Sequence, residues 1–180
     1  MKKVLILSGS PRKGGNSDIL CDEFMRGAQD AGNQVEKIFV AEKKIGYCTG
    51  CYFCKNHGGR CALNDEMGDI LQKIIDCDVL VLSSPVYFYS ISAQLKTLLD
   101  RTVARWTEIA SKDLYYIATA AESDEDTLTT TLACFHGFAM CIDGYEEKGT
   151  LYGKGVYEKG DVLKRPELIQ IAYEMGNSVK

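Results

Sequence analysis

The chain lacks an excess of positive charge. Its 180 residues carry 21 Lys and Arg against 25 Asp and Glu, which gives a formal net charge of −4. A general nucleic-acid-binding surface needs a basic excess, so we expect no nucleic-acid partner. The chain also has no apolar run near the roughly 20 residues of a membrane-spanning helix, so we expect no membrane association.

A secretion signal, internal repeats, low-complexity segments and linkers are also missing from the sequence. The first apolar stretch, Val4–Leu7, is short and runs directly into a glycine-rich turn, so it predicts a first strand rather than a signal peptide. These features predict a cytoplasmic protein with one domain over residues 1–180 and a cysteine-rich loop at 46–64.

Short apolar runs alternate with helical patterns along the chain. Runs such as Val79–Leu82 are typical of strands buried on both faces. Strands are predicted at 4–7, 34–40, 79–82, 114–119 and the second half of 144–152. Helices are predicted from Ser17, over 65–76, around Leu95–Thr102, after the entry Ser123-Asp124-Glu125-Asp126, and from Pro166. This alternation predicts an α/β fold, a doubly wound parallel sheet with helices on both faces, whose ligands bind at the carboxyl ends of the strands.

The turn after the first predicted strand has the composition of an anion site. Its glycines let backbone N–H groups converge, Ser10, Asn16 and Ser17 add side-chain donors, and Arg12 adds positive charge. The pattern is neither that of a nucleoside triphosphate site nor that of a dinucleotide site. A single phosphate monoester, as on FMN, fits better; an ordinary polar turn that caps a helix is the alternative.

The turn after the third predicted strand is rich in aromatic residues. Pro85, Val86, Tyr87 and Phe88 offer an apolar wall and backbone donors, which a flavin ring needs. The alternative is that these aromatic side chains belong to the core or to a dimer surface.

Four of the eight cysteines fall in one window, at Cys48, Cys51, Cys54 and Cys61. This spacing is close to the ferredoxin-type run that holds a [4Fe–4S] cluster. Zinc, free thiols or a redox disulfide, and a motif that has lost its metal are the alternatives. The other four cysteines are expected to be buried and structural, namely Cys21, Cys77, Cys134 and Cys141, with the last two on one helix.

The order of these motifs carries a family resemblance. The strings Gly9–Arg12, Gly15–Ser17 and Ser84–Phe88, followed by Gln94–Lys96 and Asp100-Arg101, resemble the flavodoxin-like NAD(P)H-dependent FMN reductases, above all their iron–sulfur flavoprotein branch. The resemblance extends from Lys3 to about Arg101. It implies a flavodoxin-like five-stranded sheet, and a homodimer or homotetramer with flavin sites near subunit interfaces.

The resemblance also implies roles for single residues. Ser10, Arg12, Asn16 and Ser17 would hold the FMN phosphate; Pro85, Val86, Tyr87 and Phe88 would line the flavin ring; and Cys48, Cys51, Cys54 and Cys61 would bind a [4Fe–4S] cluster. A third flavin loop of the family is often glycine-rich. Residues 119–124 depart from that pattern, so the contacts of this loop stay open.

These observations predict an FMN-dependent oxidoreductase. It would carry electrons from NAD(P)H or ferredoxin through FMN to a small acceptor or to the cluster. No acid–base pair is evident in the sequence, and hydride transfer to a flavin needs none, so no catalytic residue is predicted. The alternatives are a non-enzymatic FMN/[4Fe–4S] electron-transfer protein and, in a third class, a zinc- or disulfide-based redox sensor without flavin.

Overall fold

The computed structural model describes residues 1–124 and 126–180. Five strands form one parallel sheet in the order β2-β1-β3-β4-β5. The strands are β1 (Lys3–Ser8), β2 (Gln34–Phe39), β3 (Val79–Pro85), β4 (Asp113–Thr119) and β5 (Glu146–Gly153). This sheet confirms the predicted doubly wound α/β fold.

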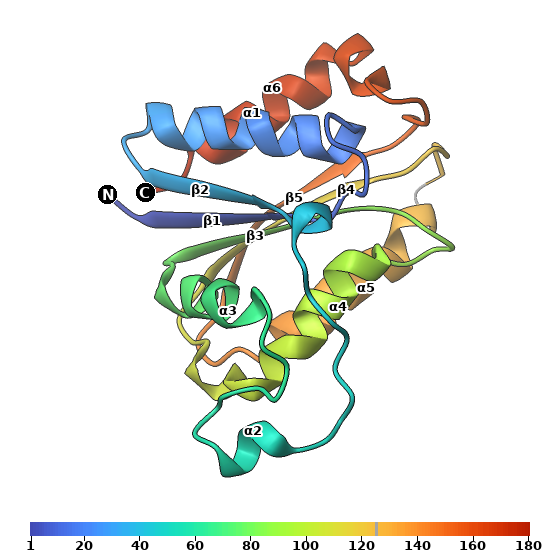
Figure 1. The fold of residues 1–180 in the computed structure, drawn as a ribbon. Helices are drawn as coiled ribbons and strands as arrows, with labels where there is room; N and C mark the ends of the chain where they lie inside the picture. The colour runs from blue at the N-terminus through green and yellow to red at the C-terminus, as the bar shows by residue number, and fades with distance from the viewer. Residues whose placement is uncertain (125) are drawn as a thin grey trace.

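Helices cover both faces of the sheet (Figure 1). Helices α1 and α6 lie on one face, and α3, α4 and α5 lie on the other. The helices are α1 (Asn16–Asp30), α2 (Phe53–Asn56), α3 (Met67–Asp76), α4 (Ala93–Arg101), α5 (Asp126–Ala139) and α6 (Pro166–Asn177). Short 3-10 helices occur at Val40–Glu42, Thr102–Ala104, Trp106–Glu108 and Asp161–Lys164.

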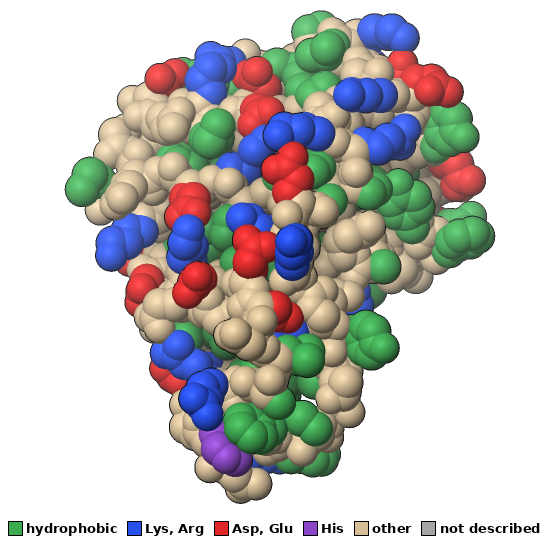
Figure 2. All heavy atoms as spheres, in the orientation of Figure 1, with side chains coloured by type: hydrophobic (Ala, Val, Ile, Leu, Met, Phe, Trp, Pro, Cys, Tyr) green, Lys and Arg blue, Asp and Glu red, His purple; other side chains and the backbone are tan. Residues whose placement is uncertain are grey.

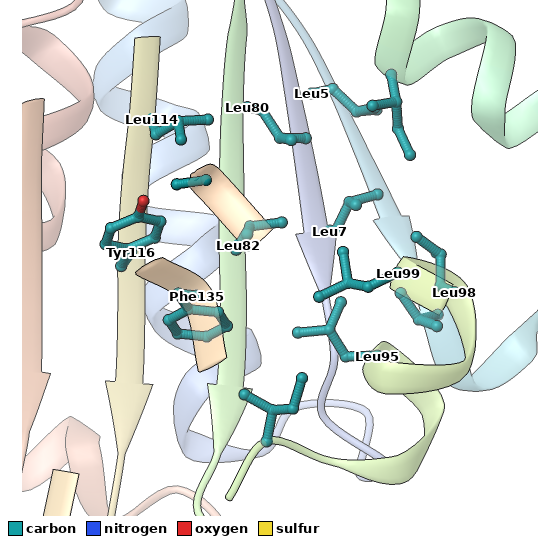
Figure 3. Packing of buried hydrophobic residues seen from close by; sticks show 14 of the residues in the cluster. Leu5, Leu7, Leu80, Leu82, Leu95, Leu98, Leu99, Leu114, Tyr116 and Phe135 are labelled. Atoms are coloured by element: carbon teal, nitrogen blue, oxygen red, sulfur yellow. The ribbon is translucent and has the colours of Figure 1, made fainter. Parts of the chain in front are cut away.

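The central strands carry apolar residues along their middle because both faces of the sheet are buried there. Along β1, Leu5 and Leu7 face α3 and α4, whereas Val4 and Ile6 face α1. Figure 3 shows the first of these two cores, in which leucines of β1 and β3 meet Leu95, Leu98 and Leu99 of α4. None of the helices in the described residues is long and apolar enough to cross a bilayer.

The structure corrects several predicted boundaries. Residues Ser83–Pro85, predicted as a turn, continue β3 because they pair with Ile117–Thr119 of β4. Strand β5 begins at Glu146, so the polar half of the predicted segment is also a strand. The segment at 46–64, predicted as a loop, contains the one-turn helix α2. Glu125, part of the predicted helix entry, lies outside the described residues.

Two of the four cysteines that were expected to be buried are not. Cys21 and Cys77 are buried, and burial raises the pKa of their thiols, to about 12 and about 11 respectively. Cys141 is exposed and follows the end of α5 at Ala139, and Cys134 is only half-buried. The prediction was wrong for Cys141 because it continued the helical pattern past the turn that ends α5, and it was wrong for Cys134 because that residue lies on α5 without being fully buried.

Two glycines let α1 and α6 pack backbone to backbone. A β-carbon on Gly176 would lie 2.0 Å from the Phe24 carbonyl oxygen, and one on Gly27 would lie 2.0 Å from the Tyr173 carbonyl oxygen. No side chain can occupy either point, so glycine at both positions sets the distance between these helices.

We therefore expect Gly176→Ala to destabilise the fold by about 1–3 kcal/mol, because an added methyl group must push the helices apart. Gly137 of α5 is the matched control, since a β-carbon there meets no atom within 4 Å. Gly137→Ala should raise the free energy of unfolding by about 0.5–1 kcal/mol. Denaturant titration of both variants checks the pair, and equal effects would contradict the packing argument.

Candidate functional site

The strand order reverses between β1 and β3, so the loops after these two neighbouring strands lie beside each other at the carboxyl edge of the sheet. The Gly9 N–H donates to the Ser83 carbonyl at 2.8 Å, and the Ser92 hydroxyl donates to the Gly9 carbonyl at 2.6 Å. A β-carbon on Gly9 would lie 2.6 Å from the Ser83 oxygen. Glycine is therefore required where the first loop leaves the sheet.

The loop of residues 10–15, here called the phosphate loop, folds tightly on itself. The Ser10 hydroxyl donates to the Arg12 carbonyl at 2.9 Å, and the Gly15 N–H donates to the same carbonyl at 2.8 Å. A β-carbon on Gly15 would lie 2.8 Å from that oxygen and 2.9 Å from Ser10 Oγ. The loop thus brings the first turn of α1 to the end of β1.

Asp18, which the sequence analysis did not single out, holds the phosphate loop against the end of β1 and against β2. Its carboxylate is 2 % exposed and accepts hydrogen bonds from the Ser8 hydroxyl at 2.8 Å, the Gly14 N–H at 2.9 Å and Lys37 Nζ at 3.0 Å. Burial alone would raise the pKa of Asp18, but these donors outweigh it and lower that pKa below its ordinary value. An Asp in the first turn of a helix was the available signal.

Ser17 carries the clearest sign of a ligand. Its side chain is 1 % exposed, and its hydroxyl has no hydrogen-bond partner among the described residues. Such a buried hydroxyl normally has a partner. It lies in the first turn of α1, where N–H groups lack partners within the helix and the dipole favours an anion. The residues present therefore fit a phosphate group.

Asn16 joins the phosphate loop to the segment after β5. Its side-chain N–H donates to the Glu158 carbonyl at 2.9 Å, and its side-chain oxygen accepts from the Val162 N–H at 3.1 Å. Arg12 is exposed, and its guanidinium lies 3.5 Å from the Tyr157 carbonyl. The four predicted phosphate residues therefore lie together in the phosphate loop and the first turn of α1, and the side chain of Asn16 holds a neighbouring segment.

The aromatic turn has a strained backbone. Tyr87 and Ser90 exchange backbone hydrogen bonds of 2.9 and 3.0 Å, which closes a two-residue hairpin loop. Phe88 and Tyr89 occupy its tip at φ values of 48° and 59°, a region that bulky residues rarely adopt. The Phe88 side chain is fully exposed, so the turn holds an aromatic ring out in solvent.

A cleft of about 250 Å³ lies beside this turn. Val86 and Phe88 line it on one side, and Ala120–Glu122 and Thr127 line it on the other. The Val86 N–H donates to the Thr119 carbonyl at 2.8 Å, which ties the two loops together. The loop at 119–124, whose contacts the sequence left open, is thus a wall of this cleft. Pro85, at the end of β3, and Tyr87 lie next to the cleft lining in the chain.

The cysteine segment, residues 46–64, is attached to the body of the protein at its ends. Arg101 of α4 is 2 % exposed and donates to the Gly46 carbonyl at 2.6 Å and to both Asp65 carboxylate oxygens at 2.7 and 3.0 Å. Burial alone would raise the pKa of Asp65, but Arg101 and the backbone N–H groups of Gly46 and Met67 lower it. One buried ion pair therefore closes the base of the segment.

Between these anchors the segment projects away from the sheet, as the narrow lower end of the molecule in Figure 2. Cys48 and Cys51 are exposed, and Cys54 and Cys61 are half-buried. A cavity of about 820 Å³ separates the second half of the segment from α3 and α4. Within residues 1–124 and 126–180, no three Cys, His, Asp or Glu side chains lie together as a metal site. The four thiols thus do not form a ligand set in this conformation.

The strand order, the phosphate loop and the adjoining cleft define the class of the protein as flavodoxin-like. The family described as NADPH-dependent FMN reductase matches residues 2–141, and the chain belongs to that family. The predicted family and fold are thereby confirmed.

Similar proteins extend this result. An iron–sulfur flavoprotein from Archaeoglobus fulgidus is 42% identical over 101 residues, which are 56% of this chain and 45% of the relative. The iron–sulfur flavoprotein MJ1083 from Methanocaldococcus jannaschii is 42% identical over 100 residues, 56% of this chain and 51% of the relative. The chain therefore spans about half the length of these relatives. The azoreductase structure from Bacillus anthracis shares the fold, with a TM-score of 0.78 at 15% identity, covering 99% of this chain and 100% of that one.

We expect Asp18→Asn to lower the free energy of unfolding by about 2 kcal/mol at neutral pH, because it removes a buried charge partner of Lys37. The folded-state pKa of Asp18 is lowered, so its stabilisation is fully present above the unfolded value of about 3.9 and is lost as the pH falls through the folded-state pKa. The difference between wild type and Asp18→Asn should therefore shrink below about pH 4.

Asp22→Asn is the matched control for this prediction. Asp22 also pairs with Lys37, but its side chain is 48% exposed, so its loss should cost less than about 1 kcal/mol. Denaturant titration between pH 7 and pH 2 measures all three proteins. A difference between wild type and Asp18→Asn that stays constant over this range would contradict the assignment.

Proposed function

We propose that this protein is an FMN-dependent oxidoreductase that uses NAD(P)H to reduce a small acceptor. The observation that carries the proposal is the buried Ser17 hydroxyl at the amino end of α1, which has no partner among residues 1–124 and 126–180. Family membership and the flavoprotein relatives support FMN as the cofactor. In this proposal Ser10, Arg12, Asn16 and Ser17 hold the phosphate, Asn16 through the segment that it anchors.

The flavin ring would bind in the cleft beside the aromatic turn. Pro85, Val86, Tyr87 and Phe88 would form its apolar wall, and residues 120–122 would face them across the cleft. The strain at Phe88 and Tyr89 supports this placement, because strained backbone tends to occur at functional sites.

FMN would supply the two-electron chemistry, by accepting a hydride from NAD(P)H and passing electrons to an acceptor such as a quinone. The protein's own contribution is to bind and orient. The phosphate loop fixes one end of the cofactor, and the cleft presents the ring to solvent beside Phe88. This division of labour needs no acid–base residue.

We also propose that Cys48, Cys51, Cys54 and Cys61 are the ligands of a [4Fe–4S] cluster. Their spacing and the iron–sulfur flavoprotein relatives support this. Because the thiols are apart in the present conformation, binding would require the segment between Gly46 and Asp65 to close around the metal.

The proposed assembly is a homodimer or homotetramer. An apolar hollow of about 360 Å³, lined by Val103, Trp106 and Phe138 among others, supports burial of this face against another copy. Reduced ferredoxin is the proposed alternative electron donor.

For the flavin site, we expect the purified protein to bind FMN and to oxidise NADH or NADPH when a quinone is present. Ser17→Ala should weaken FMN binding about tenfold, because one phosphate hydrogen bond is lost. The same change should leave the stability of the flavin-free protein unchanged or higher, because it removes an unpartnered buried hydroxyl.

Thr131→Val is the matched control, since Thr131 Oγ1 is also buried without a described partner but lies on α5. It should leave FMN affinity unchanged. Failure of the wild-type protein to take up FMN would overturn the proposal. FMN binding and rapid exchange with reduced ferredoxin, but no oxidation of either nicotinamide, would favour the electron carrier.

For the cysteine segment, anaerobic reconstitution with ferrous iron and sulfide should give about four irons per chain and a broad absorbance near ~400 nm beyond that of the flavin. Cys54→Ser should lose this iron, whereas Cys141→Ser, at an exposed cysteine outside the segment, should keep it. One zinc per chain, or no metal with FMN still bound, would refute the cluster and leave the flavin site standing.

A further inference from the structure

The segment after β5 reaches back over the phosphate loop. We infer that residues 157–162, here called the strap, place Lys159 as a further ligand of the cofactor phosphate; this rests on the proposed FMN site. The strap lies outside residues 2–141, which the family matches, and its residues were not predicted to bind.

Asn16 fixes the strap against the first turn of α1. It accepts from the Val162 N–H at 3.1 Å and donates to the Glu158 carbonyl at 2.9 Å, so it holds both sides of Lys159. Within the strap, the Asp161 carboxylate accepts from the N–H groups of Tyr157 and Glu158 at 3.2 and 2.7 Å. Gly160 has a φ of 85°, which permits the tight return of the chain. The strap is therefore an ordered turn with a defined position.

This position brings the Lys159 side chain to the phosphate loop. A β-carbon on Gly14 would lie 3.3 Å from Lys159 Cε and 3.7 Å from its Nζ. Gly14 has a φ of 66°, a backbone conformation in which most residues would be strained. Because glycine has no side chain, the Lys159 side chain can lie directly against the loop backbone there.

The charges around the loop leave Lys159 free for an anion. Lys13 pairs with Glu42, and Lys37 pairs with Asp18 and Asp22. Lys159 is exposed. The nearby Asp161 carboxylate pairs with Lys164 instead, and among the residues that the structure describes Lys159 forms no ion pair. Together with Arg12, it gives the loop two cations that a phosphate dianion can engage.

The test compares FMN with riboflavin, which has the same ring but no phosphate. Lys159→Met should weaken FMN binding about tenfold and leave riboflavin binding unchanged, measured by quenching of flavin fluorescence. The loss should diminish at high salt, because an exposed charge pair is screened. Lys159→Arg should restore most of the FMN affinity.

Lys148→Met is the matched control. It removes the same charge at the amino end of β5, where Lys148 pairs with Asp113 and Glu146. It should leave the affinity for both flavins unchanged. Unchanged FMN affinity in Lys159→Met, or an equal loss for FMN and riboflavin, would overturn the inference. Absence of FMN binding in the wild-type protein would overturn the proposed function as well, so the two failures are distinguishable.

A double variant tests the role of Asn16 as the residue that positions the strap. Asn16→Ala should weaken FMN binding in the wild-type background and add little in the Lys159→Met background, since both changes remove the same contact. Fully additive losses would instead show that Asn16 contributes separately from Lys159, and would overturn its positioning role.

Discussion

The carboxylate of Asp18 is the contact on which the phosphate loop depends. It joins the end of β1 through Ser8, the loop itself through Gly14 and the neighbouring strand β2 through Lys37. A buried charge persists only when it is paired and hydrogen-bonded, and here all three partners come from different elements. This one carboxylate therefore ties together the end of β1, the loop, the start of α1 and the neighbouring strand β2.

The negative charge of Asp18 would weaken phosphate binding at the neighbouring loop if no positive group balanced it. Lys37 lies against Asp18 at 3.0 Å, and the Gly14 N–H points to the same carboxylate, so the negative charge is compensated on the inner side of the loop. The first turn of α1 carries the buried Ser17 hydroxyl, which has no hydrogen-bond partner among the described residues. The Asp18 carboxylate and the proposed phosphate are therefore bound by separate sets of hydrogen-bond donors.

Periodicity predicted the fold because each central strand is buried on both faces and leaves a continuous apolar run, as in Val4–Leu7. Composition, and not periodicity, singled out the turn at residues 10–15, because glycines and small polar residues gather there. Both missed the roles of Asp18 and Arg101, because their ion-pair partners Lys37 and Asp65 lie 19 and 36 residues away in the sequence. Periodicity misplaced Cys141 because a helical pattern does not mark where a helix ends.

The cysteine segment and the flavin site are held by different anchors. The Arg101–Asp65 ion pair holds the base of the segment. The phosphate loop is held by a hydrogen bond to Asp18, and the strap by one to Asn16. None of these polar contacts is shared, so a change in the segment need not disturb the loop. Helix α4 touches both: its first turn follows Ser92, which bonds to Gly9 beside the phosphate loop, and its last residue is Arg101. This helix is therefore one route, beside direct contact between the two groups, by which the proposed metal and the proposed flavin could be coupled.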